Sequence, residues 1–108
     1  MKKDKTVYKL HADVCKALAH AIRIEIIDVL RGKEMTFSQI LEKTGELKSN
    51  LSQHLSVMVN KGILVSRKKG LNVFFKLSSA KVTKACHLMH EVLIDKLNKH
   101  NSILKQKL

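Results

Sequence analysis

The chain has 108 residues, of which 44% are hydrophobic, and this composition excludes a disordered protein and fits one compact domain. It carries 21 Lys and Arg against 9 Asp and Glu, a formal net charge of +12, which favours a polyanion such as DNA as the partner. No stretch has the length of a membrane span and the first residues hold no apolar signal-peptide core, so we expect a cytoplasmic protein with no membrane partner.

Two helices are predicted in the first third of the chain. Residues 6–20 carry apolar side chains at the i, i+3, i+4, i+7 spacing of an amphipathic helix. The next apolar series, from Ile22 to Leu30, is dense enough for a buried central helix that ends at Gly32.

A helix-turn-helix pattern follows at residues 36–62. Thr36 and Gln39 have the spacing of a capping box, which predicts a short helix that stops at Gly45. A second helix, from Ser49 to Gly62, begins with polar residues and continues with apolar residues at helical spacing, and we expect Ser49 to cap it. Two short helices joined by a few residues that include glycine are typical of a helix-turn-helix, in which the second helix reads DNA.

The segment after this pair predicts a β-hairpin over residues 63–77. β-branched and aromatic residues stand on both sides of a turn at Lys68, Lys69 and Gly70, and a basic hairpin in this place indicates a wing. Ser78 or Ser79 then caps a long last helix, at about residues 79–105, whose apolar stripe exceeds the needs of a small core. This stripe suits the same helix of a second subunit. The predicted fold is mainly α with a small β-hairpin, a winged helix-turn-helix.

Three segments resemble the ArsR/SmtB family of winged-helix repressors. They are KALAHAIRI at residues 16–24, LSQHL at 51–55 and RKKGLNVFFKL at 67–77. The family often has proline where this chain has Ala21. The resemblance implies a homodimer joined through its first and last helices, at about residues 5–20 and 79–105. It also implies a protein that occupies promoter DNA and leaves it on a metal, metalloid or oxidised-sulfur signal.

The candidate DNA-binding residues lie on the second helix of the pair and on the wing. Gln53 suits adenine, which offers both a donor and an acceptor in the major groove, whereas the basic side chains suit phosphates or a minor groove. Two copies of the helix would meet successive major grooves of an inverted-repeat operator. The candidates are Lys48, Ser49, Asn50, Ser52, Gln53, His54, Arg67, Lys68 and Lys69.

The sensing sites that the resemblance suggests are missing. Residues 36–44 hold no cysteine, and the positions of the family's zinc site on the last helix look like Ser79, Lys81, Val92 and Asp95, which cannot form it. The cysteines of the sulfide sensors would stand near Asp28 and Ile94, and neither is cysteine.

Two other pairs remain as sensing candidates. His11 and Cys15, like Cys86 and His90, are four residues apart and so face one way on a helix. If the first and last helices pack together, the four side chains form a Cys2His2 set for zinc or another thiophilic metal ion. The alternatives are a reversible redox pair of Cys15 and Cys86, which requires an accessible thiolate of low pKa, or no sensing site.

The predicted function is a dimeric transcriptional repressor. We find no glycine-rich phosphate loop, nucleophile elbow or acid–base pair, so an enzyme is not expected. The alternatives are a winged-helix module that binds protein or RNA, or a DNA-binding regulator without a small-molecule site.

Overall fold

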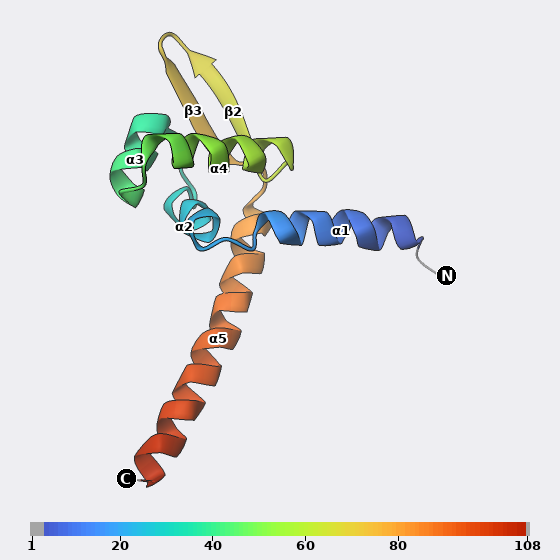
Figure 1. Ribbon diagram of the computed structural model, residues 1–108, viewed down its shortest axis with the longest axis vertical. Helices are drawn as coiled ribbons and strands as arrows, with labels where there is room; N and C mark the ends of the chain where they lie inside the picture. The colour runs from blue at the N-terminus through green and yellow to red at the C-terminus, as the bar shows by residue number, and fades with distance from the viewer. Residues whose placement is uncertain (1–3, 108) are drawn as a thin grey trace.

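A computed structural model describes residues 4–107 and shows a winged helix-turn-helix, which confirms the predicted fold class (Figure 1). Helix α4 lies across the body beneath a β-hairpin, and α5 leaves the body on the opposite side. Within the described residues, no helix is both long and apolar enough to cross a bilayer. The helices are α1 (Lys5–Ala17), α2 (Ala21–Val29), α3 (Phe37–Thr44), α4 (Lys48–Asn60) and α5 (Ala80–Lys107), and the strands are β1 (Met35–Thr36), β2 (Leu64–Lys69) and β3 (Asn72–Leu77).

Helix α2 lies at the centre of the core, as its dense apolar series predicted. Ile26, Ile27 and Leu30 are almost wholly buried, and they belong to one cluster with Leu51 and Leu55 of α4. This burial removes apolar surface from water, which is the main favourable term in folding. The core therefore fixes α4 by its inner face and leaves its outer face in solvent.

Helix α1 is shorter than the predicted residues 6–20 and projects from the body (Figure 1). Its start is capped by the Asp4 carboxylate, which accepts from the Thr6 N–H at 2.9 Å. It ends at Ala17 because the chain straightens before α2, where His20 has an extended backbone with φ −139°. Only Ala17 of this helix is buried among the described residues.

Helix α3 has the predicted signal at each end, a capping box at its start and a glycine at its stop. The Thr36 hydroxyl accepts from the Gln39 N–H at 3.2 Å, and the Gln39 side chain accepts from the Thr36 N–H at 2.9 Å. Gly45 ends α3 as predicted, with φ 66°, a left-handed conformation that suits glycine.

The prediction that Ser49 caps α4 is wrong. Leu47 occupies the cap position without a side-chain hydrogen bond, and Ser49 is exposed in the first turn. The Thr44 hydroxyl satisfies the turn instead, because it accepts from the Glu46 N–H at 3.4 Å and donates to the Ile40 carbonyl at 2.9 Å. The cap position therefore lies two residues earlier than predicted, and the helix starts at Lys48.

The far end of α4 sets the direction of the wing. The N–H of Gly62 donates to the Val59 carbonyl at 3.0 Å, and the N–H of Ile63 donates to the Met58 carbonyl at 2.9 Å. These two bonds form a Schellman motif, with Gly62 at φ 76° and with Met58 and Ile63 both buried. The predicted stop at Gly62 is confirmed, and β2 leaves the helix at a fixed angle.

The wing is the predicted hairpin, with a different turn. Lys69 pairs with Asn72, so Gly70 and Leu71 form a two-residue loop, whereas Lys68 and Lys69 belong to β2. A glycine of positive φ in the first loop position is typical of a type II′ turn, whose twist matches that of the strands. The sheet also has a third strand that the sequence did not reveal, because β1 is only two residues long and pairs with β3.

Replacing Thr36 with Ala tests the capping box. The change removes one of the two reciprocal hydrogen bonds, so we expect the free energy of unfolding to fall by about 1 kcal/mol. Urea denaturation measures this loss. Ser38→Ala is the matched control because Ser38 lies exposed in the same first turn, and an equal loss in both variants would contradict a specific capping role.

Candidate nucleic-acid interface

Helix α4 has one buried face and one polar face. Leu51, Leu55 and Met58 are buried on the inner side. Four of the candidate base-reading or phosphate-binding side chains are exposed with no side-chain hydrogen bond recorded within the described residues. They are Lys48, Ser49, Ser52 and Gln53.

Asn50 is exposed as well, but its amide has a partner within the chain. Its Nδ2 donates to the Glu46 carboxylate at 3.3 Å, one helical turn back. This contact lies at the surface and orients the amide at the start of α4. The amide keeps its carbonyl oxygen free for an incoming donor.

His54 is turned partly inward, unlike the other α4 candidates. Its Nδ1 accepts a hydrogen bond from Arg23 Nε at 3.1 Å, and its ring lies 5.9 Å from the ring of His20. Because Nδ1 is the acceptor, the ring is neutral with its proton on Nε2. His54 therefore joins α4 to the body.

Arg23 has a structural role that the sequence did not reveal. It is only 9% exposed, and its guanidinium also donates to the Ala17 carbonyl at 3.1 Å. It thus connects the end of α1, the start of α2 and the middle of α4. The one feature of the sequence that could have indicated this role is that Arg23 is a cation within the apolar series of α2. A second link between α1 and the end of α4 is the ion pair of Lys61 and Asp13 at 2.7 Å.

Burial lowers the pKa of His54 below its ordinary value of 6.5, and the charge of Arg23 and the neighbouring His20 lower it further. A protonated imidazole would lose its Nδ1 acceptor and face the guanidinium. The same contact therefore holds His54 neutral and fixes its orientation.

On the wing, Arg67 is held by an acidic partner. Its guanidinium donates to both carboxylate oxygens of Glu34, at 2.6 and 2.9 Å, and stacks over the Phe74 ring at 4.7 Å. The hydrogen bond with Arg67 lowers the pKa of Glu34, and the hydrogen bond with Glu34 raises the pKa of Arg67. The pair ties the wing to the segment before β1.

Lys68 and Lys69 lie on opposite faces of β2 because side chains alternate along a strand. Lys68 shares its face with Leu64 and Ser66, toward α4, whereas Lys69 shares its face with Arg67. Between α4 and this strand runs a groove of about 430 Å³ that is lined by Phe37, Ser52, Leu55, Ser56, Val59, Asn60, Ser66 and Phe75. Of the three wing cations predicted to bind DNA, Lys68 therefore lies on the face that borders the groove, whereas Arg67 and Lys69 lie on the other face.

The sensing candidates are not brought together in one chain. Cys15 is exposed on α1, whereas Cys86 and His90 line a groove of about 530 Å³ between α2 and α5 that neither His11 nor Cys15 lines. Within residues 4–101, no three His, Cys, Asp or Glu side chains lie close enough to hold a metal ion. A single subunit therefore does not fit the expected Cys2His2 site.

The alternative of a redox pair requires a thiolate of low pKa, and Cys86 does not provide one. Burial against α2 raises the pKa of this thiol, which favours the protonated form at neutral pH. Beside it, His87 forms an ion pair with Glu91 at 3.0 Å when the imidazole is protonated.

Comparison with known proteins assigns the family. Residues 20–66 match the family described as bacterial regulatory protein, arsR family. The transcriptional activator HlyU of Vibrio cholerae is 31% identical over 77 residues, which are 71% of this chain and 71% of HlyU. The chain belongs to the arsR family. Members of this family are transcriptional regulators, so the chain is a regulator and not an enzyme.

Two solved structures share this arsR-family fold. The crystal structure of Rv0081 from Mycobacterium tuberculosis has a TM-score of 0.78 and 28% identity, over 87% of this chain and 95% of that one. A winged helix-turn-helix domain from Mycobacterium bovis, described as homodimeric, has a TM-score of 0.76 and 23% identity, over 88% of this chain and 92% of that domain.

Replacing His54 with Gln tests the contact with Arg23. The folded pKa lies below 6.5, so the stability that neutral His54 contributes is complete above that pH and is lost as pH falls through the lowered pKa. Gln offers an acceptor to Arg23 without titrating. We therefore expect the wild type to lose more stability than His54→Gln between about pH 7.5 and about pH 5, measured by urea denaturation.

The matched control is His100→Gln, a change at an exposed position far along α5. This variant should follow the pH curve of the wild type. Parallel curves for His54→Gln and the wild type would show that the neutral imidazole contributes nothing to the fold.

Proposed function

We propose that the chain is a DNA-binding repressor of the cytoplasm that occupies an inverted-repeat operator as a homodimer. The observation that carries the proposal is the exposed polar face of α4, held beside a basic wing. A recognition helix of this kind places amide and hydroxyl side chains at base edges, and wing cations add phosphate contacts. A dimer on promoter DNA represses by excluding the polymerase from the same site.

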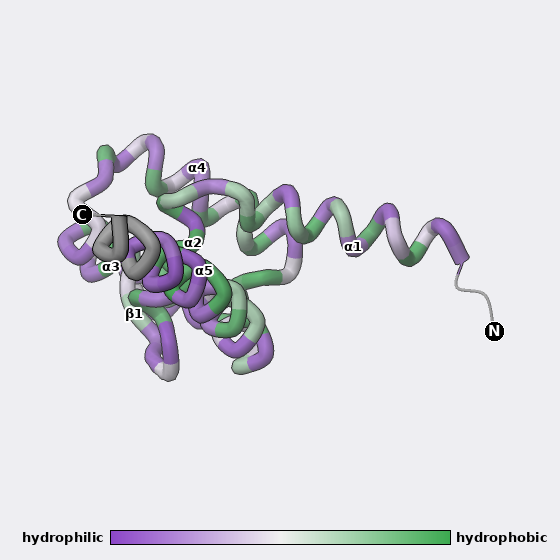
Figure 2. The backbone as a smooth tube through the Cα atoms, turned by 90° about the horizontal axis from the view of Figure 1, so that it is seen from below, coloured by the Kyte–Doolittle hydropathy of each residue, from purple (hydrophilic) through white to green (hydrophobic). Residues whose placement is uncertain are grey.

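The homodimer is supported by apolar surface that one chain leaves uncovered. Seen from below, α1 stands clear of the body and hydrophobic segments recur along it (Figure 2). Leu10 of α1 is 63% exposed, and Val92 of α5 is 62% exposed. The exposed large apolar side chains of α5 are Leu88, Met89, Val92, Leu93, Ile94 and Leu97. A soluble protein rarely leaves such stripes in water, so a second copy is their natural cover.

The net charge of +12 favours DNA over a protein partner. Each neutralised phosphate releases a counterion, so binding should weaken steeply with salt. The polar face of α4 adds sequence preference to this attraction. A module that bound RNA or protein would show no preference for an inverted repeat.

Gel shifts on inverted-repeat DNA, with Gln53→Ala and Lys68→Ala, test the proposal. Gln53→Ala should weaken operator binding by about 1–3 kcal/mol and leave non-specific DNA binding unchanged, because it removes a base contact. Lys68→Ala should weaken both and lower the slope of log affinity against log salt by about 0.9. Lys99→Ala, at an exposed site far along α5, is the control.

Two outcomes would contradict this assignment. Equal binding of the wild type to the inverted repeat and to unrelated DNA would contradict recognition of an inverted-repeat operator. Unchanged operator affinity in Gln53→Ala would remove Gln53 as a base reader, since this exposed side chain has no partner recorded within the described chain.

We further propose that a metal or thiol-reactive signal releases the protein from DNA through Cys15 and Cys86. The support is their placement on α1 and α5, the two helices proposed to form the dimer. A Cys2His2 set with His11 and His90 would require α1 of one subunit beside α5 of its partner. A modified or ligated thiol in such an interface would change the distance between the two copies of α4.

Operator release under zinc, arsenite, copper(I) and polysulfide tests the sensor, with Cys15→Ser and Cys86→Ser alongside. We expect one of these agents to release the wild type and neither mutant to respond. A mutant that responds normally excludes its cysteine from the mechanism. A wild type that ignores all four agents would leave a DNA-binding regulator without a metal or thiol sensor.

A further inference from the structure

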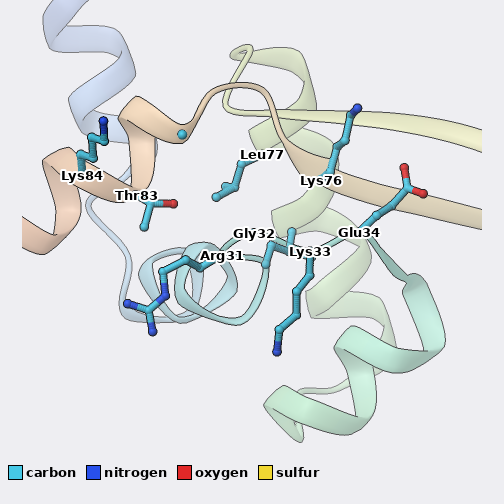
Figure 3. A pocket seen from close by; sticks show the side chains of 10 residues that line it. Arg31, Gly32, Lys33, Glu34, Lys76, Leu77, Thr83 and Lys84 are labelled. Carbon is cyan, nitrogen blue, oxygen red and sulfur yellow. The ribbon is translucent and has the colours of Figure 1, made fainter.

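A hollow of about 570 Å³ lies where α2 ends, β3 ends and α5 begins (Figure 3). Its apolar surface comes from Leu30, which is 1% exposed, and from Leu77 and Ala80. The side chains of Leu77 and Thr83 face one another across it. We call this feature the cationic hollow, because four basic residues surround its apolar surface.

The charges around the cationic hollow are unbalanced. Arg31, Lys33, Lys76 and Lys84 line it against a single carboxylate, that of Glu34. That carboxylate is already bound at both oxygens by the Arg67 guanidinium. Within the described residues, no salt bridge is formed by Lys33, Lys76 or Lys84, and Arg31 has only an exposed contact with Asp28 at 3.4 Å.

DNA at α4 does not explain these cations. Lys76 pairs with Val65 and so lies on the sheet face opposite to the one that borders the groove beside α4, which carries Ser66 and Phe75. Lys33 belongs to the link between α2 and β1, and Lys84 belongs to α5. The hollow therefore points to a ligand other than the operator.

We propose that the cationic hollow binds a small organic anion. Its volume falls within the range of small-molecule pockets, about 300–1,000 Å³. The apolar body of the ligand would pack on Leu30 and Leu77, and the Thr83 hydroxyl would accept or donate one hydrogen bond. In Figure 3 the ammonium groups of Lys33, Lys76 and Lys84 point outward on different sides, so the acidic group would bind a lysine side chain that turns over the hollow. Inorganic phosphate matches the charge but leaves the apolar floor uncovered.

A ligand in this hollow would touch both sides of the connection between the wing and the last helix. Leu77 is the final residue of β3, and Ala80 is the first residue of α5. The wing carries proposed DNA contacts and α5 carries the proposed dimer stripe. The hollow is thus placed for an effector, and it needs no metal or thiol chemistry.

Titration with 8-anilinonaphthalene-1-sulfonate, an aromatic sulfonate, tests the site. We expect one probe per chain in the wild-type protein, measured by calorimetry and fluorescence. The double variant Lys33→Glu with Lys84→Glu should lose about tenfold or more in affinity, because it reverses two charges around the hollow. Ala80→Phe should abolish binding by filling the space without changing the charge.

The single variant Lys99→Glu is the matched control, since it reverses an exposed charge on the same helix outside the hollow. Equal probe binding by all variants would overturn the proposal. So would inorganic phosphate that displaces the probe at equal concentration, because the apolar floor would then have no role. If Ala80→Phe does not fold, the charge-reversal pair decides.

A gel shift with the same variants keeps this proposal separate from the DNA-binding proposal. Loss of probe binding with an intact operator shift supports the hollow alone. If the wild type binds the probe at this site but binds no operator, the anion-binding proposal is supported and the repressor proposal is contradicted.

Discussion

The buried guanidinium of Arg23 constrains how three helices meet. It lies in a region of apolar side chains, where an unpaired cation would be costly, and its acceptors are the Ala17 carbonyl and the neutral ring of His54. Hydrogen bonds of a charged donor contribute about 1.5–3 kcal/mol each. Losing either acceptor would leave the cation partly unsatisfied, so α1, α2 and α4 keep one arrangement. The orientation of α4, the proposed recognition helix, is therefore linked to the helix that projects from the body.

The basic residues of the chain perform different tasks, although they look alike in the sequence. Arg23 joins helices, Lys61 pairs with Asp13, and Arg67 braces the wing through Glu34 and Phe74. Lys68 instead forms no salt bridge within residues 4–101 and lies on the strand face that borders the groove beside α4. A net charge thus explains attraction to DNA as a whole, but the contacts decide which cations are free to meet a phosphate.

Local patterns predicted most of the fold, and they failed where a competing local contact or a partner distant in the sequence decides. The capping box at Thr36 and the glycine stops at Gly45 and Gly62 are local signals, and the structure confirms them. Ser49 looked like a cap, but a turn satisfied by Thr44 moved the start of α4. In the candidate site, the exposed positions of α4 followed from helical spacing. The inward turn of His54 did not, because its partner Arg23 is 31 residues away.

The projecting position of α1 has a consequence for how occupancy of DNA depends on the amount of protein. Helix α1 has exposed apolar side chains and one buried residue, so in the proposed homodimer its order would be coupled to association by mass action. Arg23 links this helix to α4, because it donates to the Ala17 carbonyl of α1 and to His54 of α4. If the chain binds DNA as the proposed homodimer, the population competent to bind then grows faster than in proportion to the number of chains. Such a regulator responds to its own expression level with a threshold, before any chemical signal acts on it.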